Sequence, residues 1–141
     1  MTSHTLWMLA PLCLHFGQIV GLYVLLTWAR LVVVRRGEAA KADFARADGD
    51  PRLSARIQRN LANQFEAPVF AWIGAFALIL TDHVTMWDVA AGWLFLLGRL
   101  VHSWVQCTGD NVALRGQVFT INFVAVLWLM GHAASALLGG P

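Results

Sequence analysis

Polar and charged side chains recur at intervals of three or four residues in two stretches of the sequence. The first stretch contains Arg56, Arg59, Asn60, Asn63, Gln64 and Glu66. The second contains Arg99, His102 and Gln106. Positions 56, 59, 63 and 66 of the first stretch, and 99, 102 and 106 of the second, have the spacing of one face of an α-helix. Because guanidinium groups outnumber carboxylates on these two faces, the pattern predicts a site that binds an anionic ligand.

Arg99 stands well inside an otherwise apolar stretch. By helical rise it lies about 14 Å from the nearer end of the predicted helix. A charge at such a depth in a membrane costs several kcal/mol and marks a functional site by default. Glu66 is the only carboxylate at a comparable predicted depth, so we expect an ion pair between Arg99 and Glu66.

A second interpretation of these polar residues is purely structural. Transmembrane bundles use amide, hydroxyl and imidazole side chains to form hydrogen bonds between helices. We assign this role to the isolated polar residues His15, Gln18, Asn122 and His132. The two longer faces favour a ligand site, but interhelical hydrogen bonding remains open for them.

The composition predicts the elements that carry these faces. The chain of 141 residues is 58% hydrophobic and 13% charged, against about 25% charged residues in soluble domains. Four apolar stretches, at 7–34, 57–80, 86–108 and 114–138, reach the roughly 20 residues that a helix needs to cross a bilayer. We therefore expect an all-α integral membrane protein in a lipid bilayer, with residues 1–141 forming one four-helix transmembrane domain. Pro68 predicts a kink in the second helix.

The distribution of charge predicts the orientation. All ten Lys and Arg residues lie in the first and third loops or on the helix segments leading to them. The positive-inside rule therefore puts loops 35–56 and 109–115 in the cytoplasm and both termini outside it. A net charge of +2 is too small to indicate a nucleic-acid partner. The preference for Arg over Lys suits a bacterial protein, hence the inner membrane, and we predict no metal site.

The two polar segments resemble a known family. Arg56-Ile57-Gln58-Arg59-Asn60, running on to Glu66 and Pro68, resembles the second-helix signature of the MAPEG family, the membrane-associated proteins of eicosanoid and glutathione metabolism. Gly98-Arg99-Leu100-Val101-His102, followed by Arg115, resembles the third helix and next loop of that family. The motifs are closest to its microsomal prostaglandin E synthase and glutathione transferase branches, and the resemblance covers the whole chain.

This resemblance implies a homotrimer of four-helix subunits, with glutathione as co-substrate held between neighbouring subunits near the cytoplasm. Arg115 matches the arginine that stabilises the glutathione thiolate. The implied glutathione-binding positions are Arg30, Arg56, Arg59, Asn60, Asn63, Glu66, Arg99, His102 and Gln106. The implied activity is that of a transferase or peroxidase acting on a hydrophobic electrophile or hydroperoxide.

Two other functions remain open. Gln106 stands where family members often have a tyrosine, which favours a non-catalytic member that binds a lipid or another ligand and acts through a partner. Arg115 favours the enzyme. A proton-coupled transporter or channel, with Glu66, His102 and Arg99 as a relay, is the third interpretation.

Overall fold

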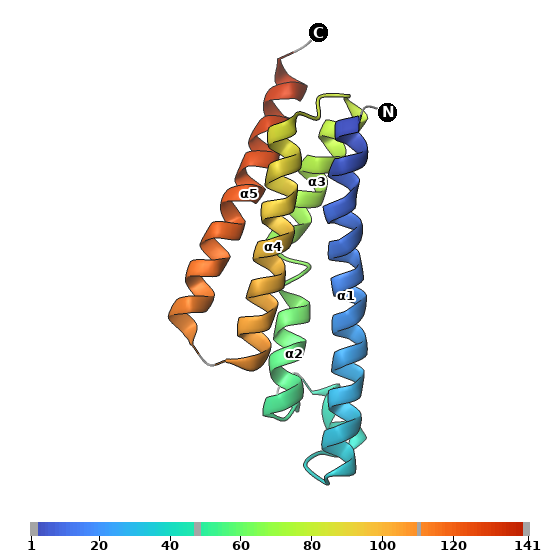
Figure 1. The fold of residues 1–141 in the computed structure, drawn as a ribbon. Coiled ribbons are helices and arrows are strands. Elements are labelled where there is room, and N and C mark those ends of the chain that lie inside the picture. Colours follow the sequence, from blue (N-terminus) through green and yellow to red (C-terminus); the bar gives the residue numbers. More distant parts are fainter. Residues whose placement is uncertain (1–2, 47–48, 110, 140–141) are drawn as a thin grey trace.

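The computed structural model describes residues 3–46, 49–109 and 111–139, and within these ranges the regular elements are all helices. They are α1 (Ser3–Arg35), the short 3-10 helix η1 (Lys41–Ala45), α2 (Arg52–Ala62), α3 (Ala67–Leu80), α4 (Met86–Thr108) and α5 (Val112–Leu138). Helices α2 and α3 follow one another along the bundle and together form one of its long segments, beside α1, α4 and α5 (Figure 1). The predicted all-α, four-helix fold is thereby confirmed. Residues 47–48 and 110 of the two predicted cytoplasmic loops lie outside the described residues.

Among the described residues, three helical segments are long and apolar enough to cross a membrane: Ser3–Arg35, Arg52–Leu80 and Val112–Leu138. The remaining long helix, α4, has several polar residues on its inner face. Those that are buried are Asp88, Arg99, His102, Ser103 and Gln106. The polar face of helix α4 therefore points into the bundle, where the other helices cover it.

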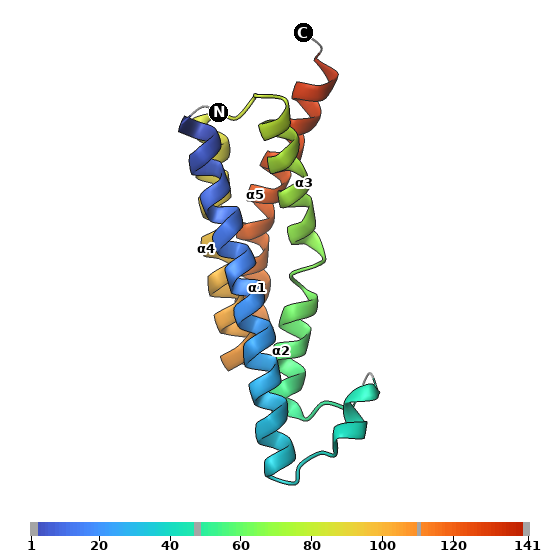
Figure 2. The same ribbon diagram turned by 90° about the vertical axis from the view of Figure 1, so that its right-hand side faces the viewer.

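The chain leaves helical geometry between α2 and α3, at residues 63–66, where Figure 2 shows an extended connection. We predicted a kink, and the structure has a break instead. Glu66 has φ −96° and ψ −115°, outside the helical region, and Pro68 lies in the first turn of α3. A proline has no N–H to continue the helix, and it is tolerated in a first turn for the same reason.

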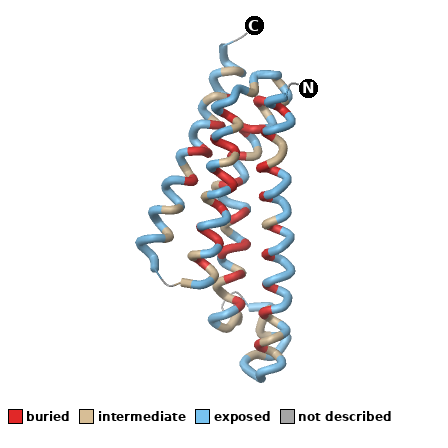
Figure 3. The backbone as a smooth tube through the Cα atoms, viewed as in Figure 1, coloured by how far each residue is buried: buried red, intermediate tan, exposed pale blue. Residues whose placement is uncertain are grey.

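The apolar core has two parts. Around Met8, Leu12 and Phe95, side chains of α1, α3, α4 and α5 form the larger cluster. Ile19 and Ile57 belong to a smaller cluster, mainly between α1 and α2. In Figure 3 the buried positions run along the inner faces of the helices. Because His15 comes between the α1 residues of the two clusters, a polar layer separates them.

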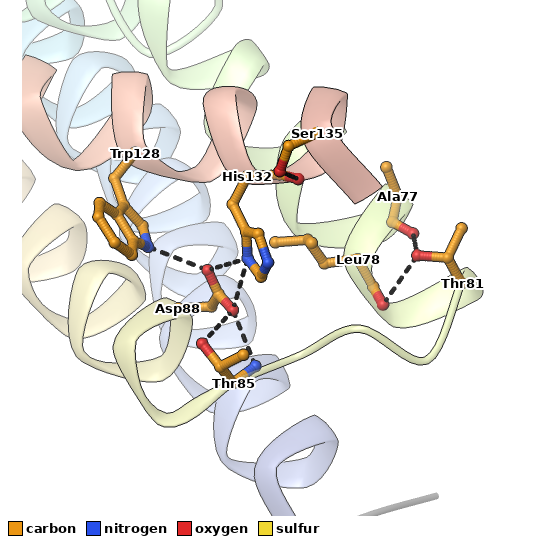
Figure 4. Close-up of polar contacts among 8 residues, drawn as sticks. All are labelled: Ala77, Leu78, Thr81, Thr85, Asp88, Trp128, His132 and Ser135. Carbon is orange, nitrogen blue, oxygen red and sulfur yellow. Dashed lines mark hydrogen bonds and ion pairs between the residues drawn. The ribbon is translucent and has the colours of Figure 1, made fainter. Parts of the chain in front are cut away.

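The end of the bundle that holds both termini carries a buried carboxylate, that of Asp88 (Figure 4). Thr85 donates to it from its backbone N–H at 2.8 Å and from its hydroxyl at 2.6 Å. From α5, Trp128 Nε1 donates at 3.0 Å, and His132 Nδ1 lies 2.9 and 3.0 Å from the two carboxylate oxygens. The side chain of Asp88 therefore joins the start of α4 to α5.

Candidate functional site

A cavity of about 530 Å³ lies at the other end of the bundle, which we call the basic end because η1 and most of the arginines are there. Residues of α2, the break, α4 and α5 line it. They are Arg59, Ala62, Asn63, Glu66, His102, Gln106, Val112, Arg115, Gly116 and Phe119. Two guanidinium groups thus line the cavity, with a single carboxylate among the described lining residues.

Hydrogen bonds hold the amide and imidazole side chains of this wall. The side-chain oxygen of Gln106 accepts a hydrogen bond from Asn63 Nδ2 at 3.3 Å. The same oxygen lies 3.0 Å from His102 Nε2. One amide oxygen therefore connects the end of α2 to α4 and fixes how three lining residues are turned.

Arg115 lies in the first turns of α5 and is half-buried. Helix α5 begins with a cap, because the side chain of Asn111 accepts a hydrogen bond from the backbone N–H of Leu114 at 2.9 Å. A helix N-terminus carries a partial positive charge of about half an elementary charge. The start of α5 and the Arg115 guanidinium therefore both favour an anion in the cavity.

A polar layer lies behind the cavity, in the middle of the bundle. Its centre is Gln64, whose side-chain oxygen accepts from Arg99 Nε at 3.0 Å and lies 3.0 Å from His15 Nε2. Gln18 Nε2 donates to the hydroxyl of Ser103 at 2.6 Å. His15 and Gln18 thus form hydrogen bonds between helices, as we expected of them.

Arg99 does not pair with Glu66, and that prediction was wrong. Arg99 is fully buried and donates to the Gln64 side chain and, at 3.3 Å, to the backbone carbonyl of Asn63. Its Nη1 atom has no hydrogen-bond partner among the described residues. Glu66 is exposed, because the break turns it out of the helical register from which the pairing was inferred. Its charge reaches Arg99 only over a longer distance.

A second, apolar groove of about 560 Å³ adjoins the cavity between α3 and α5. Phe65, Val69, Phe70, Phe123, Leu127 and Met130 are among its lining residues. Glu66 lines both spaces. The stacked rings of Phe119, in the cavity, and Phe123, in the groove, have centroids 5.7 Å apart. A polar and an apolar compartment therefore meet at the break.

Comparison with known proteins identifies the family. The family model described as "MAPEG family" matches residues 14–135, most of the chain. This chain belongs to the MAPEG family. Neither the comparison with curated proteins nor the comparison with solved structures gave a match. Membership of the MAPEG family supports a membrane protein of eicosanoid and glutathione metabolism.

The structure of this MAPEG chain brings together six of the ten predicted site residues. Arg59, Asn63, Glu66, His102, Gln106 and Arg115 all line the cavity. Arg56 is half-buried and lies outside the cavity lining. Asn60 and Arg99 are fully buried behind it. Asn60 donates from Nδ2 to the sulfur of Cys107 at 3.3 Å.

Arg30 is the tenth predicted residue, and it is held away from the cavity. It forms a two-point ion pair with Asp50, at 3.0 and 2.6 Å, and contacts the ring of Phe44 at 4.9 Å. The hydrogen bonds from Arg30 keep the pKa of Asp50 below its usual value. Within one subunit, Arg30 therefore fixes the segment after α1 and does not reach the cavity.

Two features of the MAPEG site escaped the sequence prediction. Phe119 lines the cavity, and its position four residues after Arg115 on a helix was a usable signal. Asn122 was expected to form hydrogen bonds between helices. It is buried, but neither polar atom of its side chain has a partner among the described residues.

Proposed function

We propose that this chain is a glutathione-dependent membrane transferase or peroxidase. The observation that carries the proposal is the charge of the cavity. Arg59 and Arg115 line it with Glu66 as the one carboxylate among the described lining residues. Glutathione carries two carboxylates and one ammonium group, so its charges complement those of the cavity. Arginine is well suited to such a ligand because its planar fork binds a carboxylate at two points.

Arg115 is the proposed catalytic residue. The glutathione thiol has a cysteine-like pKa of about 8.5, so most of it is protonated at neutral pH. A guanidinium group near the sulfur favours the thiolate, which is the nucleophile. The thiol proton passes to water. In conjugation, the sulfur bonds to an electrophilic carbon as the bond from that carbon to its leaving group breaks, and the leaving group departs with the electron pair. In peroxide reduction, the sulfur bonds to one oxygen as the O–O bond breaks and the other oxygen leaves as an alcohol after protonation from water; a second glutathione then converts the resulting sulfenic acid to the disulfide and water.

The apolar groove supports a lipophilic second substrate. It lies between α3 and α5, and Glu66 lines both the groove and the cavity. A substrate dissolved in the bilayer would reach the groove without crossing water. Because the lipid is as apolar as the groove, transfer between them gains little hydrophobic free energy. The groove would therefore select its ligand by shape, and the polar cavity would select glutathione by charge.

We further propose a homotrimer in which each glutathione molecule lies between subunits. Arg30 and Arg56, which lie outside the cavity lining of their own subunit, would then be close to a neighbouring site. Both termini would lie outside the cytoplasm of a bacterial cell, with loops 35–56 and 109–115 inside it, because the ten Lys and Arg residues gather at the basic end. A reporter enzyme active only outside the cytoplasm, fused after residue 141, tests this orientation.

A non-catalytic ligand-binding protein of the same fold is the second candidate. Gln106 occupies the position at which the family resemblance leads us to expect tyrosine, and its amide oxygen is engaged by Asn63 and close to His102. A tyrosine hydroxyl could donate to a thiolate and is more acidic than an amide N–H, whereas at Gln106 only the amide nitrogen could donate. This candidate predicts that the cavity binds glutathione without ionising its thiol.

A titration separates these candidates. Purified protein in detergent is titrated with glutathione while calorimetry follows binding and ultraviolet absorbance follows the thiolate. S-methylglutathione is the control, because it has no thiol to ionise. Binding together with a thiolate signal is the result we expect. Binding without that signal would favour the non-catalytic protein, and no binding at millimolar glutathione would contradict the proposal.

A further inference from the structure

Gln64 uses both polar atoms of its side chain inside the break between α2 and α3. The side chain is buried, with 2% of the residue exposed. Its nitrogen donates to the backbone and side-chain oxygens of Asn60 at 3.0 and 3.1 Å. Its oxygen lies within hydrogen-bond distance of Arg99 Nε and His15 Nε2. Side chains from α1, α2 and α4 therefore meet at this one residue.

The direction of each hydrogen bond follows from Trp72. The indole N–H can only donate, and it lies 3.0 Å from Nδ1 of His15. Nδ1 is therefore an acceptor, and the ring proton of His15 is on Nε2, which donates to Gln64. Because Arg99 can also only donate, the side-chain oxygen of Gln64 must face both groups. A residue of α3 is thereby tied to the break as well.

The chain on either side of Gln64 faces the cavity. Asn63 lines it and donates to Gln106, and Glu66 lines it two residues later. The backbone carbonyl of Asn63 accepts a hydrogen bond from Arg99 Nη2 at 3.3 Å. Arg99 itself is fully buried and outside the cavity lining. Arg99 therefore forms hydrogen bonds to Gln64 and Asn63 from the side of the break that faces away from the cavity.

We propose that Gln64 and Arg99 are positioning residues for the glutathione site. Together they fix the path of residues 63–66, and this path places Asn63 and Glu66 on the cavity wall. Neither contacts the ligand. The inference rests on the proposed function, and it gives Arg99 a role different from the ligand contact that the family resemblance implies.

The test compares two buried glutamines. Gln64→Met removes the hydrogen bonds at the break and keeps a side chain of similar length. Gln18→Met is the matched control, because Gln18 donates to the Arg99 carbonyl at 3.1 Å and to Ser103 at 2.6 Å, and it is connected to the break only through Ser103, whose hydroxyl lies 3.4 Å from Gln64 Nε2. The affinity for glutathione is measured by calorimetry, and the melting temperature Tm is measured in the same detergent.

We expect Gln64→Met to weaken glutathione binding by about tenfold, and Gln18→Met by no more than about twofold at a similar loss of Tm. Gln64→Glu keeps an acceptor for Arg99 and His15 but loses the donor to Asn60, so it should restore only part of the affinity. Equal losses of affinity in the two Met variants would overturn the inference. If Gln64→Met does not fold, Gln64→Asn and Gln18→Asn, which keep the amide and shorten its reach, are compared in the same way, with smaller differences and the same order.

A measurement without glutathione separates this inference from the proposed function. Glu66→Cys is introduced with Cys13→Ser and Cys107→Ser, and the new thiol is labelled with a water-soluble maleimide. Adding Gln64→Met should change the labelling rate by about threefold or more, and adding Gln18→Met should not. An unchanged rate would overturn the positioning role even if glutathione binds. A changed rate in a protein that does not bind glutathione would leave positioning supported and the proposed function contradicted.

Discussion

Helix α4 carries two buried charged residues about three turns apart, and the protein treats them differently. Asp88, at the end that holds the termini, receives hydrogen bonds from Thr85 and Trp128 and lies beside His132. Arg99, near the basic end, contacts only neutral groups, and its Nη1 has no partner among the described residues. The Asp88 carboxylate thus has hydrogen-bond partners for both of its oxygens, whereas the Arg99 guanidinium keeps a donor without a partner among the described residues.

This difference separates a structural end of the bundle from a functional one. A buried charge that is fully hydrogen-bonded ties its neighbours together, and removing it leaves them unpaired. A buried charge with an unpaired donor destabilises the fold, so we expect to find it where it serves the function of the protein. Arg99 stands behind the cavity and beside the break, and Asp88 is far from both. Mutations at the two ends should therefore affect different properties.

The largest effect is expected from Asp88→Ala. It leaves donors of Thr85 and Trp128 without an acceptor, and it removes the partner of His132. Each buried donor left without its acceptor costs about 1–3 kcal/mol. We expect a loss of about 3 kcal/mol in total, because several donors lose their acceptor together. Thermal unfolding in detergent measures the loss, with Asp88→Asn as a milder control. A Tm within error of the original would show that this cluster does not hold the bundle together.

Arg115→Ala should have the opposite profile. Without its guanidinium group, the thiol of bound glutathione should return towards a pKa of about 8.5. We expect the thiolate signal at neutral pH to fall by about tenfold or more, at a nearly unchanged Tm, since each tenfold corresponds to about 1.4 kcal/mol. Arg115→Lys is the control for charge alone. A full thiolate signal in Arg115→Ala would remove this residue from the proposed mechanism.

Arg99→Met sharpens the contrast with Asp88. It removes a charge whose burial is only partly compensated, and it leaves the Asn63 carbonyl without one donor. Replacement of a poorly paired buried charge by an apolar side chain is often close to neutral. We expect a change of stability within about 1 kcal/mol, measured by thermal unfolding, together with a severalfold loss of glutathione affinity. A destabilisation as large as that of Asp88→Ala would mean that the two charges are equally well paired.

The sequence predicted the fold well because the signals for membrane helices are long. Apolar stretches of this length have few alternatives in a bilayer. The helices of the structure follow the predicted ranges except at residues 63–66, inside the stretch 57–80. The break at 63–66 was the part that could not be located. Pro68 marks a disturbance in the helix, but whether the chain bends or opens depends on tertiary partners, here Gln64 and Arg99.

The candidate site was predictable as a set of residues and not as a set of contacts. Helical spacing grouped Arg56 with Arg59, Asn63 and Glu66, and all of these except Arg56 line the cavity. It failed for Arg99 because the break changes the register at Glu66, so distances inferred from one continuous helix no longer apply. The hydrogen bonds of Asp88 could not be predicted either, since they involve residues of α5 about 40 positions later in the chain.

The smallest effect is expected at Asp50, outside the membrane-spanning segments. Its pKa is lowered in the folded protein by hydrogen bonds from Arg30, so the pair contributes stability above the unfolded-state pKa of about 3.9 and loses it as the pH falls. Arg30 is 29% exposed, which limits the contribution to about 1 kcal/mol. Asp50→Asn should therefore lower the Tm slightly at neutral pH, measured by thermal unfolding across a pH series.

The pH series decides between two origins of that loss. If the charge of Asp50 matters, the difference between the original protein and Asp50→Asn begins to shrink below a pH of about 4, where the unfolded chain takes up a proton on this carboxylate, and continues to shrink as the pH falls towards the lower pKa of the folded protein. Glu38→Gln is the control, because its ion pair with Arg36 is long, at 3.8 Å, and exposed on both sides. A difference that stays constant over the whole series would show that shape and not charge holds Asp50 in place. In that case, the charge of Asp50 would not stabilise the fold in the way that the charge of Asp88 does.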